Sequence, residues 1–557
     1  MGAKQKKKDS GGGFLAQGAI LAAAGIIVKL ISLFYRIPVT NILGDEGQGY
    51  YSTAFAVYAL ALMLTSYSMP LAVSKLVSAR LAKKQKRNAW KLFKAAFLLS
   101  ACVGGIIAIV FFFGADFIAD NILKSPLSAY PLRFLAPGLF VVSIIAVLRG
   151  YFQGLGNMIP TAVSQIIEQV VNALAAIWGA IAFLDLGKEL AKSNGIKNFD
   201  AAYGAAGATL GPVLGATAAL FFLGFLLYCY RGVIRRQIKR DVTKRDETTG
   251  QLIKIILITC APVLLSTTMY NISESLDMAL FYNIMNVQGH AYSEYTQLWG
   301  MFSGKYNTWI NVPLAMANAL GVSMMPSLTA AVTTKDQRMI HKKIYLVIRF
   351  SMLIAIPCFV GLAIMAKPIL TMFYSGNIEI PSRLMNLGAI SVVFFCLSTV
   401  TNAVLQGINR MTTPVKNAAV ALIIHLISVF VMLVMFKWNI YSIIVGNIIF
   451  SLCMCILNQK SIRRAIGYRQ EIKRTFVIPL IAAGVMGIIT FAVYTLLDIF
   501  AGGTLATVIA LLVAVLVYAA ALLLLGGLTE EEILSMPKGA ALARIFDKLH
   551  LLQAEKE

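Results

Sequence analysis

Charged side chains are scarce in this chain. Aspartate, glutamate, lysine and arginine make up 13% of the 557 residues, whereas hydrophobic residues make up 58% and the mean hydropathy is +0.76. This composition excludes an ordinary soluble globular protein. Apolar runs of about 20 residues recur along the whole chain, which is typical of an all-α polytopic membrane protein.

Motifs that mark common catalytic centres are missing as well. The sequence has no G-x-S-x-G, no H-E-x-x-H and no P-loop, so we predict no nucleophilic active site, no ATP hydrolysis and no cofactor. The four histidines are scattered, and the seven cysteines lack the spacing of zinc ligands. We therefore expect a non-enzyme without a metal site.

Acidic residues are few relative to basic ones. The chain has 25 acidic and 49 basic residues, a net charge of +24. The basic residues lie in short segments between apolar runs, without a nucleic-acid reader motif, so we predict contact with membrane lipids and exclude nucleic acid. Their alternation places both termini in the cytoplasm if the number of spans is even.

The hydropathy pattern predicts about fourteen transmembrane helices. Two six-helix lobes and a C-terminal pair account for them. The expected spans are 14–35, 50–70, 91–113, 131–153, 160–184, 203–230, 252–284, 298–325, 345–366, 384–405, 413–436, 440–458, 476–497 and 503–526.

These spans define the expected domain organisation. There is no A-x-A-like cleavage site near the N-terminus, so we expect the first span to be retained. The parts are a basic N-terminus (1–13), an N-lobe (14–230), a linker (231–251), a C-lobe (252–458), two further spans with a preceding basic loop (459–526) and a tail (527–557).

An internal repeat supports the two lobes. QGLGNMIP at 153–160 resembles QGINRMTTP at 406–414, and each segment joins the fourth and fifth spans of its lobe. Parallel repeats of this kind are found in transporters that bind substrate between the halves. Chance similarity of short Gly/Pro motifs is the alternative.

The first span carries two cations. Lys29 and Arg36 are seven residues apart and lie on nearly the same helical face. A cation in a spanning helix costs roughly 2.5–3.5 kcal/mol, so we expect a water-filled cavity that holds an anion. The alternative for Arg36 is that it extends to the lipid headgroups at the helix end.

The segment after the first span is rich in glycine. Gly44, Gly47 and Gly49 permit the backbone to bend between the first two spans, and Glu46 lies among them. We predict a gate loop here.

The eighth span contains one cation, Lys305, followed by Asn307 and Asn311. This polar stripe predicts a cavity wall that contributes to substrate binding, with helix–helix contact as the alternative.

Two carboxylates on the seventh span, Glu274 and Asp277, share one helical face because they are three residues apart. They are candidates for pairing with Lys305 or Lys29, for carrying a coupling cation or proton, or for an ion pair between the lobes.

The fifth span has a polar stripe at i, i+3, i+4 and i+7, formed by Gln165, Glu168, Gln169 and Asn172. Such a stripe must face protein or water rather than lipid. Glu168 is a candidate partner for Arg149 or Lys29.

Three segments carry a resemblance to a known family. KLISLFYRIPVTNILGDEGQGYYSTAFAVYAL, SMPLAVSKLVSARLA and LRGYFQGLGNMIPTAVSQIIEQ resemble the SpoVB/MurJ-like polysaccharide-biosynthesis proteins of the multidrug/oligosaccharidyl-lipid/polysaccharide (MOP) exporter superfamily. The resemblance implies six plus six spans with two extra C-terminal spans, and a monomer in the bacterial plasma membrane. It implies a flippase for an undecaprenyl-pyrophosphate-linked saccharide, with lipid II favoured, and cell-wall synthesis proteins as candidate partners.

The resemblance also implies roles for particular residues. Lys29 and Arg36 match cavity-facing cations that hold the pyrophosphate, the loop from Gly44 to Gly49 matches a gate, and 476–526 would form a groove for the lipid tail. One departure matters: the best-studied branch has arginines on its first two spans, whereas the second span here begins without a cation. We expect Lys305 to substitute for it.

Several alternatives stay open at this point. A cation-coupled multidrug exporter of the same superfamily, a flippase for another lipid-linked polysaccharide and an integral membrane glycosyltransferase are the competing functions. The lipid could be vegetative lipid II or a sporulation precursor. Membrane potential, Na⁺ or H⁺ could drive the cycle.

Overall fold

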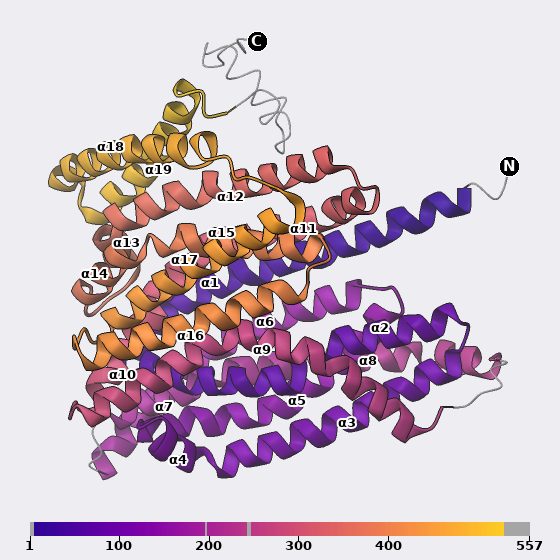
Figure 1. Ribbon diagram of the computed structural model, residues 1–557. Coiled ribbons are helices and arrows are strands. Elements are labelled where there is room, and N and C mark those ends of the chain that lie inside the picture. The colour runs from indigo at the N-terminus through magenta and orange to yellow at the C-terminus, as the bar shows by residue number, and fades with distance from the viewer. Residues whose placement is uncertain (1–4, 195–197, 242–246, 529–557) are drawn as a thin grey trace. The chain divides into compact units, whose positions relative to one another are not determined.

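The computed structural model describes residues 5–194, 198–241 and 247–528, and within these ranges every regular element is helical. The chain divides into two compact units, Met1–Gly304 and Lys305–Glu557. Each unit is described separately below. Figure 1 shows the order of the helices along the chain.

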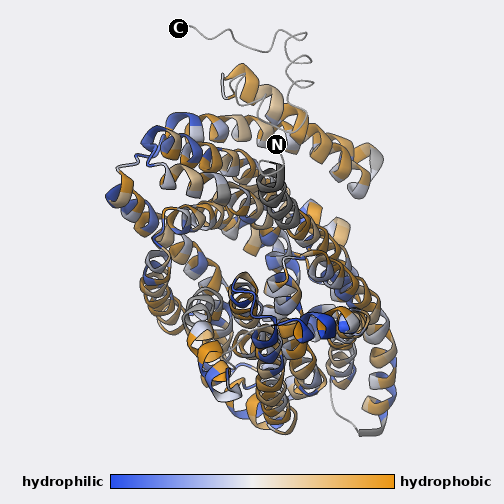
Figure 2. Cartoon of the chain, turned by 90° about the vertical axis from the view of Figure 1, so that its right-hand side faces the viewer, coloured by the Kyte–Doolittle hydropathy of each residue, from blue (hydrophilic) through white to orange (hydrophobic). Residues whose placement is uncertain are grey.

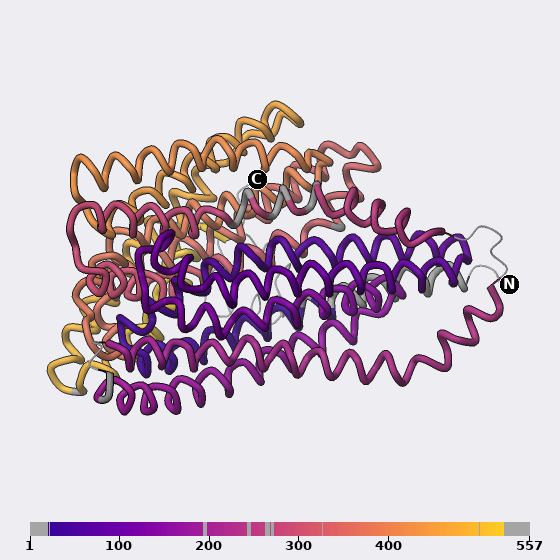
Figure 3. Tube along the Cα trace, turned by 90° about the horizontal axis from the view of Figure 1, so that it is seen from below, coloured from indigo at the N-terminus to yellow at the C-terminus, as the bar shows by residue number. Residues whose placement is uncertain are grey.

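The first unit is a bundle of long helices, and its helices from α1 to α8 run alongside one another in Figure 3. Its elements are α1 (Gln5–Leu62), η1 (Met63–Tyr67), α2 (Met69–Ala82), α3 (Lys86–Phe113), α4 (Ala115–Phe117), η2 (Ile118–Ile122), η3 (Pro126–Ser128), α5 (Ala129–Gly154), α6 (Ile159–Asn194), α7 (Phe199–Ala208), α8 (Leu210–Lys239), α9 (Thr249–Val287), α10 (Tyr292–Gly300) and η4 (Met301–Tyr306), the last crossing into the second unit.

The second unit is also a helical bundle. Its elements are α11 (Asn307–Thr333), α12 (Gln337–Ile364), α13 (Ala366–Phe373), α14 (Glu379–Gly388), α15 (Ser391–Gly407), α16 (Thr412–Val434), α17 (Tyr441–Ile466), η5 (Lys473–Val477), α18 (Ile478–Ala501) and α19 (Gly503–Leu524). Tyr518 donates a hydrogen bond to the carbonyl of Leu353, which fastens α19 to α12.

Large apolar side chains are exposed on both units. Phe113, Phe221 and Phe500 are 77%, 74% and 81% exposed. Figure 2 shows hydrophobic colour along most of the helices. On a soluble protein such surfaces would be aggregation-prone, whereas a bilayer solvates them.

By length and composition, eleven helices in the described part of the chain can cross a membrane, or twelve if the bent pair α14–α15 is one span. The sequence predicts about fourteen. The two counts differ in identifiable places: the stretch Ala23–Ala82 is counted once, and α9 is represented by the shorter apolar helix Thr249–Ala261. The prediction placed two spans in the first stretch and one on α9.

The stretch Ala23–Ala82 is too long for one crossing. Its 60 residues would extend about 90 Å as one helix, roughly twice the thickness of a bilayer with its headgroups. Gly44 interrupts it with a non-helical backbone, φ 67° and ψ −179°. The two predicted spans, 14–35 and 50–70, lie on either side of this break.

The compact units do not coincide with the predicted lobes. The sequence divides the lobes at 251/252, whereas α9 and α10 pack within the first unit. Tyr282 of α9 is hydrogen-bonded to Thr53 of α1 at 2.7 Å, and Ser275 of α9 donates to the carbonyl of Ala56. The division into an N-lobe (14–230) and a C-lobe (252–458) remains a prediction.

Arg349 of α12 is fully buried in the second unit. Its guanidinium donates to the carbonyl of Arg474 at 2.6 Å and to the carbonyl of Gly527. The two acceptors lie before α18 and after α19, so one side chain holds both ends of the C-terminal helix pair.

Replacing Arg349 with methionine should therefore destabilise the C-terminal pair. It leaves the carbonyls of Arg474 and Gly527 without this donor, at about 1–3 kcal/mol for a buried acceptor such as that of Gly527. We expect a lower thermal unfolding midpoint for the purified chain in detergent. The control is Arg383→Met, which removes an exposed ion pair with Glu379 and should shift the midpoint little. Equal shifts for both variants would contradict this role.

Candidate functional site

The cations of α1 lie on a helix face that is directed toward protein. Ser32 lies between Lys29 and Arg36 at i+3, and it accepts a hydrogen bond from the Gln169 amide of α6 at 2.7 Å. The neighbouring Tyr35 hydroxyl accepts one from Asn172 at 3.3 Å. The predicted polar stripe of the fifth span therefore contacts the cation-bearing helix rather than lipid.

Arg36 lies close to an acidic residue of another helix. It interacts electrostatically with Glu274 of α9 and with the hydroxyl groups of Tyr35 and Tyr51. The sequence proposed Lys305 or Lys29 as partners for Glu274, and the structure brings it to Arg36 instead. This electrostatic interaction places an opposite charge near Arg36 within the first unit, which disfavours the alternative that it extends to the headgroups.

Lys29, Arg36 and Glu274 are all exposed side chains. Lys29 is also close enough to Arg36 for the two positive charges to repel each other. The group thus has two cations and one carboxylate accessible at its surface, while Asp277, the second carboxylate, is buried beside Glu274. The accessible cations can contact an anionic ligand. Guanidinium binds phosphate oxygens as a bidentate fork, while ammonium acts as a point charge.

Glu274 and Asp277 differ in their surroundings although they share a face. Glu274 is exposed, whereas Asp277 is 2% exposed. Glu274 is therefore the carboxylate that a solvated ion or substrate can reach in this conformation.

Glu168 of α6 is paired with Arg149 of α5. The Arg149 guanidinium contacts the Glu168 carboxylate at 2.6 Å and donates to Ser164 at 2.9 Å. Of the two partners that the sequence suggested for Glu168, the structure selects Arg149.

Glu46 in the predicted gate loop accepts hydrogen bonds from three separate places. The donors are Tyr50 one turn later at 2.7 Å, Asn198 before α7 at 2.7 Å and Gln297 of α10 at 3.1 Å. Ser303 of η4 adds a bond to Ser52 at 2.8 Å. In the structure the residues of the predicted gate loop are helical and belong to α1, with one break at Gly44, so the predicted loop is a kink within a helix. This part of α1 is fastened to α7 and α10 by neutral donors.

The three glycines of this segment of α1 have two different structural roles. Only Gly44 has the left-handed backbone that favours glycine. A Cβ on Gly49 would overlap the carbonyl of Thr296 in α10, and one on Gly47 would lie 3.1 Å from the carbonyl oxygen of Ala201 in α7. Gly44 confirms the expected bend, whereas Gly47 and Gly49 allow close helix contact.

Lys305 belongs to the second unit and is 2% exposed. Its ammonium donates to the carbonyls of Ser375 and Asn377 at 3.1 and 2.9 Å. These contacts anchor the segment between α13 and α14, so they do not support Lys305 as a substitute for the missing second-span cation. Asn311 is exposed and donates to the carbonyl of Asn307.

Several residues of the site were not predicted from the sequence. They are the donors to Glu46 and the tyrosines around Arg36. Tyr35 and Tyr51 flank the cation and the glycine loop in sequence, which was an available signal. Asn198 and Gln297 are 152 and 251 residues from Glu46 in the sequence, so no local pattern indicated that they contact it. Within the described residues, no three His, Cys, Asp or Glu side chains gather as metal ligands.

Gly49→Ala should weaken the contact between α1 and α10, because the added Cβ overlaps the carbonyl of Thr296. We expect the substitution to lower the free energy of unfolding by about 1–3 kcal/mol relative to the wild type, and so to lower the thermal unfolding midpoint. Gly25→Ala is the control, since a Cβ there has nothing within 4 Å, and it should be neutral or stabilising. An unchanged midpoint for Gly49→Ala would show that the contact does not matter.

Comparison with known proteins finds a family and relatives to which this chain is similar. The polysaccharide biosynthesis protein family matches residues 14–332. Stage V sporulation protein B of Bacillus subtilis (strain 168) is 27% identical over 427 residues, which cover 75% of this chain and 77% of the relative. Lipid II flippase MurJ of the same organism is 24% identical over 497 residues, 86% of this chain and 88% of the relative.

Solved structures show the same fold at lower identity. The inward closed conformation of lipid II flippase MurJ superposes with a TM-score of 0.62 at 14% identity, covering 90% of this chain and 98% of that one. An inward-facing multidrug resistance MATE family transporter of the MOP superfamily gives 0.63 at 17%, covering 79% and 94%. The apolar helices and this fold make the chain a multi-pass protein of the bacterial plasma membrane, and it belongs to the polysaccharide biosynthesis protein family.

Proposed function

We propose that this protein is a flippase that moves an undecaprenyl-pyrophosphate-linked saccharide, with lipid II favoured, from the inner to the outer leaflet by alternating access. The proposal rests on the similarity to MurJ over 88% of that protein's length and on the exposed cations of α1. It makes the chain a transporter rather than an enzyme.

The observation that carries the proposal is the position of Lys29 and Arg36. Their helix face contacts the polar stripe of α6, and both side chains are exposed. An exposed cation within a spanning helix and against a polar neighbour needs water or an anion around it. A pyrophosphate with two negative phosphate groups meets this requirement, while the polyprenyl tail stays in lipid.

The gate loop offers a way to alternate access. Glu46 fastens α1 to α10 in this structure through uncharged donors. Each such bond contributes about 0.5–3 kcal/mol net, so the contact can open at modest cost. If α9 and α10 belong to the second repeat, as the sequence predicts, opening of this contact separates the repeats at one end.

Coupling to an energy source is assigned to the Arg36–Glu274 interaction. An anionic substrate that binds Arg36 competes with Glu274, which then becomes available to H⁺ or Na⁺. Membrane potential acting on the cations themselves is the alternative driving force.

The fold alone does not separate this function from drug export, because the MATE and MurJ structures superpose equally well. The arrangement of charge is the discriminating feature. The accessible cations, Lys29 and Arg36, outnumber the one accessible carboxylate, Glu274, which favours an anionic head, whereas a site for cationic drugs would need accessible negative charge in excess.

Lys29→Ala and Arg36→Ala should each reduce flipping of lipid II in proteoliposomes by at least about tenfold, because each removes a phosphate contact worth about 1.5–3 kcal/mol. Complementation of a flippase-depleted strain should fail at normal protein levels. Arg133→Ala, which removes a partly exposed cation paired with Asp116, is the control and should transport normally. Full activity of the Lys29/Arg36 double variant would refute the proposal, and export of a cationic drug instead would favour the alternative.

Glu274→Gln should change the dependence of flipping on the ion gradient, since it removes the charge facing Arg36. We expect transport to become less sensitive to an imposed H⁺ or Na⁺ gradient, while expression is retained because Glu274 is exposed. Glu294→Gln is the control: its exposed carboxylate contacts His290 instead. Unaltered gradient dependence would place coupling elsewhere.

A further inference from the structure

The second unit has a small pocket, of about 180 Å³, where α15 ends, α16 begins and α17 ends. Two of its lining residues are cations, two carry hydroxyl groups, and none is a carboxylate. The three helices and the turn between α15 and α16 contribute Leu405, Arg410, Thr413, Ser461, Arg464 and Ala465. Cations and hydroxyl donors around one space favour an anionic ligand.

Hydrogen bonds between α16 and α17 hold the walls of this pocket together. The Asn417 amide nitrogen donates to Asn458 Oδ1 at 2.8 Å and to the Ser461 hydroxyl at 3.3 Å. Thr413 lies one turn before Asn417 on α16, and Arg464 lies one turn after Ser461 on α17. Thr413 and Arg464 are therefore on the two helix faces that meet, one turn closer to the helix ends.

A buried asparagine joins the same faces to α15. Asn458 is fully buried, and its amide nitrogen donates to Asn402 Oδ1 at 2.8 Å and to the Thr401 hydroxyl at 3.1 Å. Ser461 belongs both to this network and to the pocket wall. Because Ser461 accepts the bond from Asn417, its own hydroxyl hydrogen can be donated to a ligand.

The three helices supply no negative charge to balance the cations. The sequence contains no aspartate or glutamate between Glu379 and Glu471, an interval that includes all of α15, α16 and α17. Arg410 and Arg464 are both exposed, so a ligand can reach them. A guanidinium group binds phosphate oxygens as a bidentate fork, which makes a phosphate group a suitable anion.

Arg410 distinguishes the two copies of the internal repeat. It lies in QGINRMTTP at 406–414, whereas QGLGNMIP at 153–160 contains no cation. In the first copy, the Asn157 side chain accepts a hydrogen bond at 3.1 Å from the amide of Ile159, where α6 begins. In the second copy, Met411 provides no side-chain cap for α16. The turn itself therefore does not require an arginine, and the positive end of the α16 dipole adds to the charge of Arg410.

The pocket lies at the ends of two apolar helices. Thr412–Val434 and Tyr441–Ile466 are both long and apolar enough to cross a membrane. The pocket takes Thr413 from the first turn of one, and Ser461 and Arg464 from the last two turns of the other. Span ends lie at the headgroup level, where basic pockets between spans bind phosphate-bearing headgroups.

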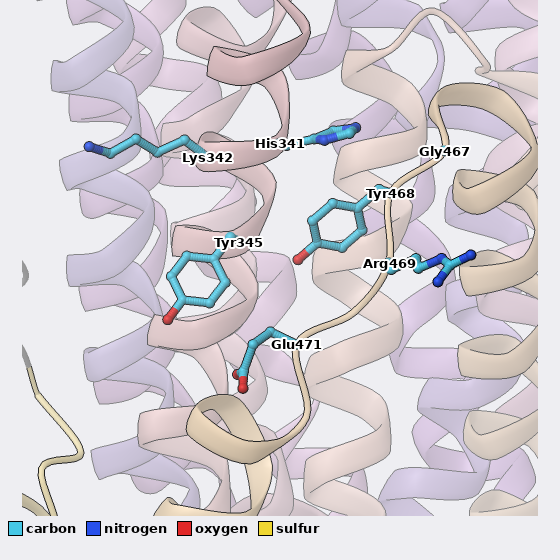
Figure 4. Close-up of a pocket in the computed structure, with 7 residues that line it drawn as sticks. All are labelled: His341, Lys342, Tyr345, Gly467, Tyr468, Arg469 and Glu471. Atoms are coloured by element: carbon cyan, nitrogen blue, oxygen red, sulfur yellow. The ribbon is translucent and has the colours of Figure 1, made fainter. Parts of the chain in front are cut away.

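A larger pocket in the same unit, of about 480 Å³, lacks this arrangement. Figure 4 shows that its Lys342 and Arg469 side chains extend in opposite directions, and that Tyr345, Tyr468 and Glu471 lie between them in this view. These two cations cannot hold one phosphate group together, so they provide a control for the effect of surface charge alone.

We propose that the pocket between α15, α16 and α17 is a binding site for a phosphate group, held by Arg410 and Arg464 with the hydroxyl groups of Thr413 and Ser461 as further donors. The site belongs to the second unit and does not depend on the proposed flipping activity. The phosphate can belong to the headgroup of an anionic phospholipid or to a small soluble phosphate ester, and the two sources share this chemistry.

The test measures binding by the purified full chain in two arms. In the lipid arm, native mass spectrometry counts phosphatidylglycerol retained after delipidation, with phosphatidylcholine for comparison. In the soluble arm, glycerol 1-phosphate is titrated at constant ionic strength and the thermal unfolding midpoint is followed. Arg410→Gln/Arg464→Gln should bind at least about tenfold more weakly in the arm that responds, because it removes both charged donors.

Lys342→Gln/Arg469→Gln is the matched control, since it removes the same charge from exposed positions outside the pocket, and it should bind as the wild type does. Thr413→Val keeps both arginines and should weaken binding about threefold, which tests the site if the double variant does not fold. A response in the lipid arm alone identifies a headgroup, and a response in the soluble arm identifies a free phosphate. Equal loss in the pocket and control variants, unchanged binding by both pocket variants, or no binding in either arm overturns the proposal.

Discussion

The need to compensate charge within apolar helices governs the first unit. Lys29 and Arg36 would each cost roughly 2.5–3.5 kcal/mol in hydrocarbon. Their face is therefore directed to α6, whose Gln169 binds the intervening Ser32. Glu274 of α9 then interacts electrostatically with Arg36. The placement of α6 and α9 around α1 follows from this constraint, because each presents polar atoms where α1 presents cations.

The contact at Glu46, which we propose as a gate, is made by hydrogen bonds from neutral groups rather than by an ion pair. Glu46 is a carboxylate, yet its bonded partners, Tyr50, Asn198 and Gln297, are neutral. A buried ion pair would be expensive to break once made, whereas neutral donors can exchange their bonds for water. The close approach of Gly49 to the carbonyl of Thr296 lets α1 and α10 pack tightly without adding a charge. Such a contact is specific when closed and inexpensive to release, as a gate requires.

Hydropathy and helical periodicity could predict the helical fold, the polar stripe of α6 and the break at Gly44, since these are local properties of sequence. The partners across the bundle could not be predicted. Nothing local distinguishes Arg36 from Lys29 as the neighbour of Glu274, or relates Glu46 to Gln297, 251 residues away. Lys305 shows the same ambiguity, because a lone cation in an apolar helix has the same pattern whether it lines a cavity or binds backbone carbonyls.

Two pairs of cations in spanning helices differ in their surroundings. In the second unit, Lys305 and Arg349 are buried, and their donors bind backbone carbonyls of Ser375, Asn377 and Gly527. Such cations hold segments together and cannot reach a ligand without loss of those bonds. In the first unit, Lys29 and Arg36 remain exposed. Under the proposed function, Lys29 and Arg36 would therefore bind the anionic head of the substrate. A transport cycle would depend on the gate at Glu46, in that same unit, to decide on which side the anion is released.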